Sequence, residues 1–189
     1  MHKTALAIAI TCGLVTTAQA DNWVLNGDAS HLAFGSVKND YIAEVHSFAG
    51  LSGEASDNAV SVKIDLASVQ TNIDIRNERM GEFVFGGVLT AELSANLDLA
   101  QFDDLAVGES TTTEFDGTLS LLGEDVSVFT DVVLIRLGDD SVMVTTNDMV
   151  FLATDELGID DGIDKLQELA SLDGIARATP ITARFMFTR

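Results

Sequence analysis

Apolar and polar residues alternate along most of this chain, and a two-residue period is typical of β-strands with one buried and one solvated face. The clearest stretch is 59–69, where the apolar side of the alternation consists of Val60, Val62, Ile64 and Leu66. The same pattern predicts strands over 23–25, 31–38, 41–55, 90–99, 113–121, 125–137 and 141–152, with a last strand that begins at Pro180. Proline is tolerated at the start of a strand. We therefore expect about eight antiparallel strands.

Two stretches break the alternation. Residues 68–85 gather charged side chains and place two phenylalanines just behind them, which predicts a short helix that crosses or caps the sheet. In residues 161–172 the apolar positions recur at helical spacing. We predict a second helix there, with Asp160 or Asp161 as its N-cap and Gly174 beyond its end.

The predicted fold class is mainly β. Many short antiparallel strands form either a two-layer sandwich or a closed barrel, and alternation alone does not choose between them. The choice matters for function, because an eight-stranded barrel has an interior just wide enough for side chains or for one slender ligand. No internal repeat, low-complexity linker or change of composition divides the chain, so we expect one domain.

The first twenty residues have the features of a cleaved secretory signal peptide. Lys3 gives a basic start, residues 5–15 are apolar, and 18–20 form a small-residue cleavage site. The apolar run is too short to span a membrane. Cys12, the only cysteine, lies inside this segment in a poor context for a lipoprotein. We therefore expect an exported domain of residues 21–189 with no thiol and no disulfide.

The chain is strongly acidic. Its formal net charge is −20, and loss of Lys3 with the signal peptide leaves 9 − 30 = −21. A surface of this charge repels nucleic acids and anionic lipid headgroups at long range, so we expect no nucleic-acid partner. We interpret the acidity as adaptation to a salty habitat in preference to a docking surface.

A series of short motifs runs through the mature chain in a fixed order. It opens with Trp23, Ser30, Leu32, Phe34, Phe48 and Gly53 and continues with Ile64, Asp65, Ser68, Val69, Thr71, Arg76 and Met80. It closes with Gly117, Leu119, Leu121, Gly123, 157–159, 163–172 and 179–181. In their order and spacing these motifs resemble the YceI-like family. The chain departs from the family pattern at Asn77, where the family usually has aspartate, and at Leu122, where histidine is common.

The resemblance implies an eight-stranded antiparallel, lipocalin-like β-barrel with a short helix after strand four and a second helix near the C-terminus. It also implies export to the periplasm and an elongated apolar cavity that holds a polyisoprenoid or similar lipid chain. Family members often accompany cytochrome b561-type membrane proteins, which suggests a quinone-like lipid and a membrane partner of that kind. A homodimer is left open.

Inward-facing apolar residues are the candidates for lining such a cavity. They are Phe34, Phe48, Ile64, Phe83, Phe85, Phe115, Leu119 and Phe185. Arg76 and Arg79 are candidates for a phosphate headgroup, because guanidinium groups bind such oxygens in forked geometry. The competing interpretation is that both arginines pair with nearby carboxylates or cap the open carbonyls of the barrel.

The sequence shows no constellation for catalysis or for a metal. The mature histidines are His31 and His46, and neither sits in a metal-binding spacing, although His46 shares parity with Glu44 and Phe48. There is no nucleophile elbow and no glycine-rich phosphate loop. We expect a binding protein that is not an enzyme and holds no cofactor. The first hypothesis is a lipid carrier. The alternatives are an accessory or sensor protein of a cytochrome b561/quinone system and a ligand-free stress-response scaffold.

Overall fold

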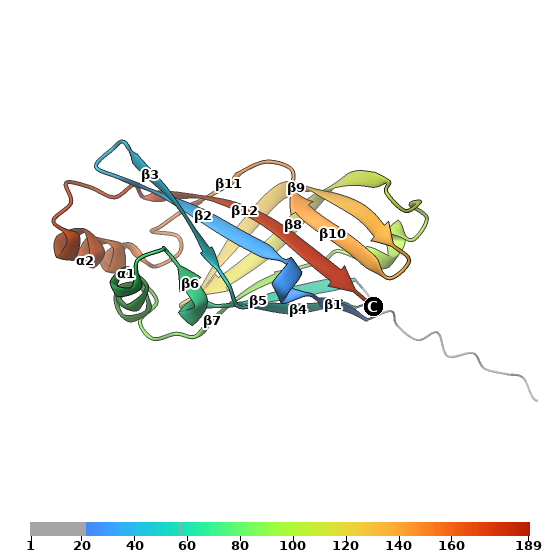
Figure 1. Cartoon of the computed structure of the whole chain (residues 1–189), viewed down its shortest axis with the longest axis horizontal. Helices are drawn as coiled ribbons and strands as arrows, with labels where there is room; N and C mark the ends of the chain where they lie inside the picture. Colours follow the sequence, from blue (N-terminus) through green and yellow to red (C-terminus); the bar gives the residue numbers. More distant parts are fainter. Residues whose placement is uncertain (1–21, 57) are drawn as a thin grey trace, which may run out of the picture.

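Strands dominate the computed structural model of the chain, which describes residues 22–56 and 58–189. The predicted signal peptide (residues 1–20), Cys12 within it and the expected first mature residue, Asp21, lie outside the described residues. The strands of Figure 1 are β1 Trp23–Leu25, β2 His31–Lys38, β3 Ile42–Phe48, β4 Leu51–Ser56, β5 Ala59–Asp65, β6 Val69–Gln70, β7 Thr90–Ala95, β8 Ser110–Leu121, β9 Glu124–Gly138, β10 Ser141–Thr146, β11 Val150–Ala153 and β12 Ala178–Thr188. The helical elements are α1 Asp74–Arg79, α2 Asp160–Ala170, the π-helical turn η3 Met80–Val84 and the short 3-10 turns η1 Gly27–Ala29, η2 Leu66–Ser68 and η4 Leu99–Phe102.

The sheet closes on itself. Its strands follow the order β1-β4-β5-β7-β8-β9-β10-β12, and β12 returns to β1 through the pairs Val24↔Thr188 and Leu25↔Phe187. Every pairing is antiparallel. This ring of eight strands confirms the predicted barrel and excludes the sandwich that alternation had left open. β2, β3 and β6 continue the sheet beyond β12, and β11 also pairs with β12.

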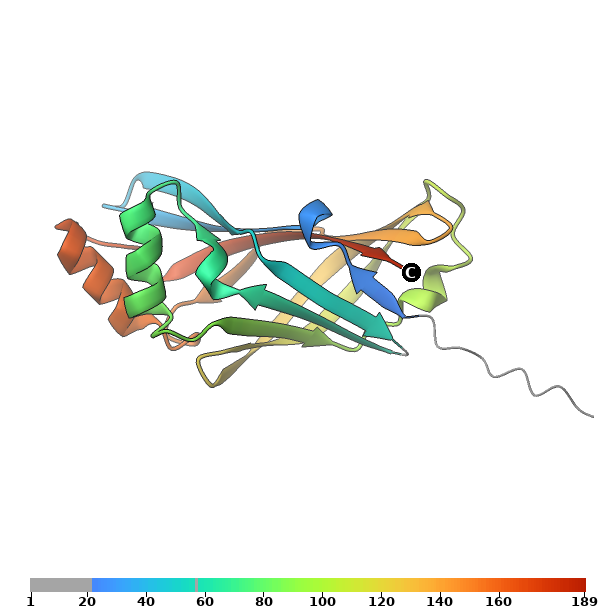
Figure 2. The same cartoon turned by 60° about the horizontal axis from the view of Figure 1, so that its bottom comes forward.

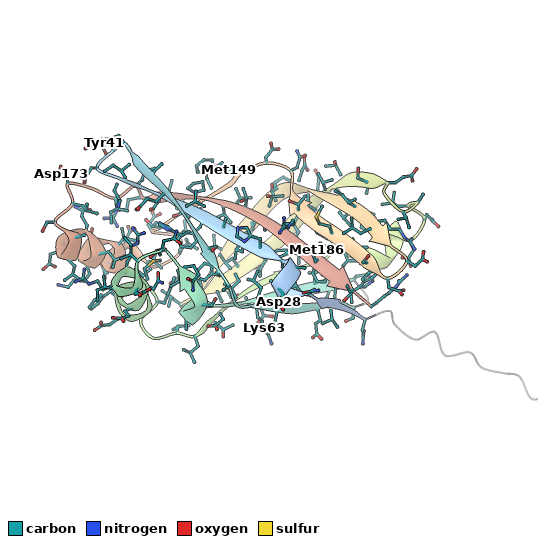
Figure 3. The ribbon with its side chains drawn as sticks, viewed as in Figure 1. Asp28, Tyr41, Lys63, Met149, Asp173 and Met186 are labelled. Atoms are coloured by element: carbon teal, nitrogen blue, oxygen red, sulfur yellow. The ribbon has the colours of Figure 1, made fainter. Side chains whose placement is uncertain are left out.

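In β5 the apolar side chains point into the barrel and the polar ones point outward, as the alternation in the sequence predicts. Val62 and Ile64 of β5 are 1% and 6% exposed, whereas Lys63 between them points away from the barrel (Figure 3). Three of the predicted strands are nevertheless interrupted. The stretch 41–55 divides into β3 and β4, 141–152 divides into β10 and β11, and 59–69 is bent after β5 by η2. The bend at η2 has a local cause, because the Asp65 carboxylate accepts a hydrogen bond from the backbone N–H of Ala67 and so caps the turn.

One end of the barrel is packed solid. Trp23, Leu134 and Phe187 are at most 2% exposed there, and the strands β1 and β4 complete the wall. The two helices α1 and α2 lie side by side across the opposite end (Figure 2). None of the helices among the described residues is long and apolar enough to cross a bilayer. The predicted central and C-terminal helices are both present.

The caps of α2 differ from the prediction. Its N-cap is Ile159, which makes no side-chain capping bond, and its C-terminal cap is Ser171 in the left-handed conformation. Asp160 is instead the first helical residue, and its carboxylate accepts a hydrogen bond from Thr154 and pairs with Arg177. The N-cap prediction is wrong. The Asp160 carboxylate binds Thr154 and Arg177, so it does not accept a hydrogen bond from the first backbone N–H groups of the helix.

Gly162 lets the two helical elements meet at backbone distance. A Cβ at this position would lie 2.6 Å from the Cα of Val84 in η3, and closer still to the carbonyl of Phe83. Gly162→Ala should therefore push α2 away from η3 and lower the free energy of unfolding by about 1–3 kcal/mol. Urea denaturation of the two proteins measures this difference. Gly174→Ala is the matched control, because a Cβ there meets nothing within 4 Å. Equal stability of the two variants would contradict the close packing.

Candidate functional site

A cavity of about 420 Å³ occupies the barrel beneath the two helices. This volume falls within the range of roughly 300–1,000 Å³ that is typical of small-molecule sites. Its wall is formed by inward side chains of the barrel strands together with α1, η3 and α2, and it is predominantly apolar. The interior of this barrel is thus hollow at the helix-covered end and filled at the other.

Seven of the eight predicted lining residues border this cavity. They are Phe34, Phe48, Ile64, Phe85, Phe115, Leu119 and Phe185. Three of them form a row of aromatic rings, with ring centroids 5.3 Å apart for Phe34 and Phe48 and 6.1 Å apart for Phe48 and Phe85. The row lies along one side of the wall and offers a continuous apolar surface.

Phe83 differs from the prediction. It is half-buried and does not border the cavity. Within η3 the side chains of Met80 and Val84 are the ones that face the cavity, and the carbonyl of Phe83 packs against Gly162 of α2. The π-helical turn places residue 83 to the side of the lining face, a local geometry that the two-residue parity with Phe85 could not reveal.

Sequence reasoning missed part of the wall. Ile163 and Leu166 of α2 face the cavity, and so do Val128 and Val132 of β9. The helical spacing of α2 was a usable signal, because an amphipathic helix must bury its apolar face somewhere. For β9 the signal was ambiguous, since residues 125–137 are apolar on both faces in their second half. The structure settles that its even-numbered residues from Val126 to Leu134 point inward.

The charged residues that border the cavity are all cationic. They are Lys38, Arg76 and Arg79, and no Asp or Glu is among the described lining residues. The whole chain has 30 acidic residues against 10 basic ones, so this local excess of positive charge runs against the composition. Ile73 and Ile75, which also border the cavity, are 46% and 50% exposed. These residues mark the mouth of the cavity beside α1.

Arg76 bridges α1 to the β2–β3 hairpin. Its Nη1 lies 2.8 Å from Oε2 of Glu44, its Nη2 donates to the carbonyl of Thr71, and Lys38 Nζ lies 2.7 Å from the same Glu44 oxygen. Burial alone would raise the pKa of Glu44. The hydrogen bonds and charges of Lys38 and Arg76 outweigh it and hold that pKa below its ordinary value. Arg76 therefore lines the cavity and pairs with a carboxylate at the same time.

Arg79 has a different environment. It is half-buried and borders the cavity, and it makes no hydrogen bond or ion pair with any described residue. The interpretation that both arginines pair with carboxylates or cap open carbonyls thus holds for Arg76, which bonds Glu44 and the carbonyl of Thr71, and is wrong for Arg79. A cation at a cavity mouth without a carboxylate partner is available to an anion.

His46 is the buried titratable residue of the wall. It is 5% exposed, its Nε2 lies 2.9 Å from the Ser36 hydroxyl, and its Nδ1 has no hydrogen-bond partner. Its ring lies 5.2 Å from that of Phe34. Burial, reinforced by the nearby charge of Arg76, lowers the pKa of His46. The described residues contain no group of three or more side chains that could hold a metal ion, and His46 is a neutral polar group in an apolar wall.

The lowered pKa of His46 makes stability depend on pH. As the pH falls below the ordinary value of 6.5, the unfolded chain binds a proton that the folded chain excludes, so the free energy of unfolding should fall between pH 7 and 5.5. His46→Gln should flatten this slope. Urea denaturation across the range measures it, with His31→Gln on an exposed residue as control. An unchanged slope in the His46 variant would contradict the assignment.

Comparison with solved structures gives two informative matches. One is a polyisoprenoid binding domain from Saccharophagus degradans implicated in plant cell wall breakdown; it is 32% identical, with a TM-score of 0.85 over 88% of this chain and 97% of that chain. The other is BcnA of Burkholderia cenocepacia, 13% identical, with a TM-score of 0.65 over 86% of this chain and 98% of that one, which supports the fold alone. No family model and no curated protein sequence matches this chain.

Proposed function

This chain belongs to the YceI-like family, and on that premise we propose that it binds a polyisoprenoid or similar lipid chain inside its barrel. The observation that carries the proposal is the apolar hollow of about 420 Å³ beneath the helices. Each five-carbon isoprene unit that leaves water contributes roughly 3–4 kcal/mol, at about 0.8 kcal/mol per carbon. A row of phenylalanine rings and aliphatic side chains supplies the surface against which such a chain is buried.

The mouth of the cavity supports an anionic headgroup on that chain. Arg79 has no carboxylate partner among the described residues, and Lys38 and Arg76 share the single carboxylate of Glu44. These three cationic side chains and the one carboxylate of Glu44 sum to a local positive charge at the mouth, where the end of the lipid chain would emerge. A phosphate or pyrophosphate group fits this site, because guanidinium and ammonium groups bind its oxygens by charge-assisted hydrogen bonds.

Arg79→Ala should weaken the binding of a polyprenyl phosphate on the order of tenfold, because one charge-assisted contact is lost. The same substitution should leave the affinity for the matching polyprenol, which carries no charge, nearly unchanged. Equilibrium binding of both lipids measures the difference. Arg184→Ala, on an exposed arginine of β12, is the matched control. Equal losses for the phosphate and the alcohol would contradict a headgroup role.

A quinone-like headgroup is the second candidate, and His46 favours it. His46 borders the cavity, and when Ser36 donates to Nε2 the buried, unpartnered Nδ1 of the neutral ring carries the hydrogen, a donor that a quinone carbonyl oxygen would satisfy once a turn of the ring exposed it. In that case the protein is an accessory or sensor of a membrane cytochrome b561/quinone system. Under either headgroup we place the protein in the periplasm, on the strength of the predicted signal peptide, and assign it no catalytic step.

Lipid transfer into the emptied barrel tests the proposal. Protein that has been stripped of lipid is incubated with vesicles that contain polyprenyl phosphate or a polyprenyl quinone, and then separated from them by gel filtration. The protein fractions are then extracted with organic solvent. We expect the extract to contain one of these lipids at close to one molecule per protein chain. The absence of both lipids from the protein fraction would overturn the proposal and favour a ligand-free scaffold.

A further inference from the structure

We propose that Phe115 closes the far end of the cavity and thereby limits the length of the lipid chain that the barrel accepts. This inference rests on the proposed function. It concerns a different property, because a barrel can bind lipid without selecting its length. A second, much smaller void lies beyond the main cavity.

The second void has a volume of about 20 Å³ and an entirely apolar wall. Its lining includes Leu97, Leu99 and Phe187, which belong to the solid end of the barrel. Four residues border both this void and the main cavity: Leu93, Phe115, Val144 and Phe185. These four side chains come from β7, β8, β10 and β12, and together they form a partition across the barrel.

Within the partition, the ring of Phe115 fills the space that a neighbouring glycine leaves open. Gly117 is the next inward-facing residue of β8, and a Cβ there would lie 2.6 Å and 2.7 Å from two ring carbons of Phe115. The ring therefore rests over the bare backbone of Gly117, with the rest of the position closed by the carbonyl of Ser94 at 2.8 Å. Phe115 is 9% exposed and borders both voids, so its ring lies between the two spaces.

The partition lies opposite the mouth. The mouth residues Ile73, Ile75 and Arg79 lie in or next to α1 at the helix-covered end, whereas the small void is lined by Phe187 of β12, which pairs with Leu25 of β1. A chain held by its headgroup at the mouth enters the barrel with its tail toward Phe115. Once the tail reaches the ring, each further isoprene unit must stay outside and gains no burial.

The test uses a homologous series of all-trans polyprenyl phosphates, from geranyl phosphate upward, and measures the dissociation constant of each. In the wild-type protein the constant should fall on the order of tenfold or more with each added unit, up to a break beyond which it stays level. Phe115→Ala joins the two voids and removes a ring with about as many carbons as one isoprene unit. The break should therefore move by about one unit toward longer chains.

Two further variants keep the test decisive. Gly117→Ala should displace the ring from its place over the bare backbone and so move the break, while Phe48→Ala, on the side wall, should weaken all long chains without moving the break. If Phe115→Ala does not fold, Phe115→Leu provides the same comparison with a smaller shift. Binding with a break that no Phe115 or Gly117 variant moves would overturn this inference and leave the proposed function intact. No binding of any member of the series, nor of the matching polyprenyl quinones, would contradict the proposed function itself.

Discussion

Replacing Leu119 with tryptophan should weaken lipid binding by on the order of 100-fold or more while leaving the barrel folded. Leu119 borders the cavity from β8, and its inward position is set by the pair with Leu93 of β7. An indole ring at this position occupies space that would otherwise bury about one isoprene unit, which is worth roughly 3–4 kcal/mol. The hollow accommodates the larger side chain, so the strain that normally follows overpacking of a core should be small.

Glu114→Trp is the matched control, because Glu114 is exposed on the outer face of the same strand. This control should bind lipid as the wild-type protein does. Thermal melting of the lipid-free proteins shows whether each variant is folded. Lipid binding by Leu119→Trp as strong as that of the wild-type protein would show that the lipid does not occupy the cavity. If Leu119→Trp fails to fold while Glu114→Trp folds normally, the barrel has no room for the larger side chain.

Phe187→Ala should lower the free energy of unfolding of the lipid-free protein by about 3–5 kcal/mol, whereas Phe34→Ala should cost less than about 2 kcal/mol. Phe187 is 1% exposed and lies in the solid end, where β1 meets β12. Truncation there enlarges a void of only about 20 Å³ among neighbours that are otherwise closely packed. Phe34 is half-buried and already faces the hollow, so its removal sacrifices fewer contacts.

Urea denaturation of both variants, after lipid removal, gives the comparison directly. In a binding assay the order of the two variants should be reversed. Phe34→Ala should weaken lipid binding more than Phe187→Ala, because Phe34 lies on the cavity wall and Phe187 does not. Equal costs in stability for the two phenylalanines would mean that the barrel is filled evenly from end to end. That result would remove the division between a hollow end and a solid end on which the proposed function depends.

An empty apolar cavity also has a stability consequence of its own. The side chains around it lack partner atoms on one face, so the lipid-free protein forgoes dispersion contacts that a filled core would make. A bound chain restores those contacts, and a ligand that binds only the folded state raises its stability by mass action. The opposite end, around Trp23 and Leu134, is packed densely and makes the contacts that the cavity walls lack.

The period-two alternation predicted where most strands lie and, in β5, which face points inward, but it did not show the interruptions of three strands or the inward face of β9. Val60, Val62, Ile64 and Leu66 are all buried as the pattern required. It could not predict closure, because closure depends on the pairing of β1 with β12 across nearly the whole length of the chain. Motif resemblance supplied the barrel, and the β1–β12 register confirms it.

The candidate site was predictable to the extent that it depends on strand parity. Phe115 and Leu119 are inward-facing by alternation, whereas Phe83 was misplaced because η3 does not follow a two-residue period. The role of Glu44 as a shared partner of Lys38 and Arg76 could not be read from spacing, since it joins residues 32 positions apart in the sequence. Long-range ion pairs of this kind appear only when the hairpin and the helix are placed side by side.

The most direct test of the central claim is the native mass of the protein recovered from its own cells without detergent, before and after extraction with organic solvent. We expect a mass that exceeds that of the polypeptide chain by one lipid molecule, and the return of the bare mass after extraction. The extracted compound should carry an isoprenoid or similar chain. A bare mass in the first measurement, together with no lipid in the extract, would contradict the claim that this barrel is built to hold one.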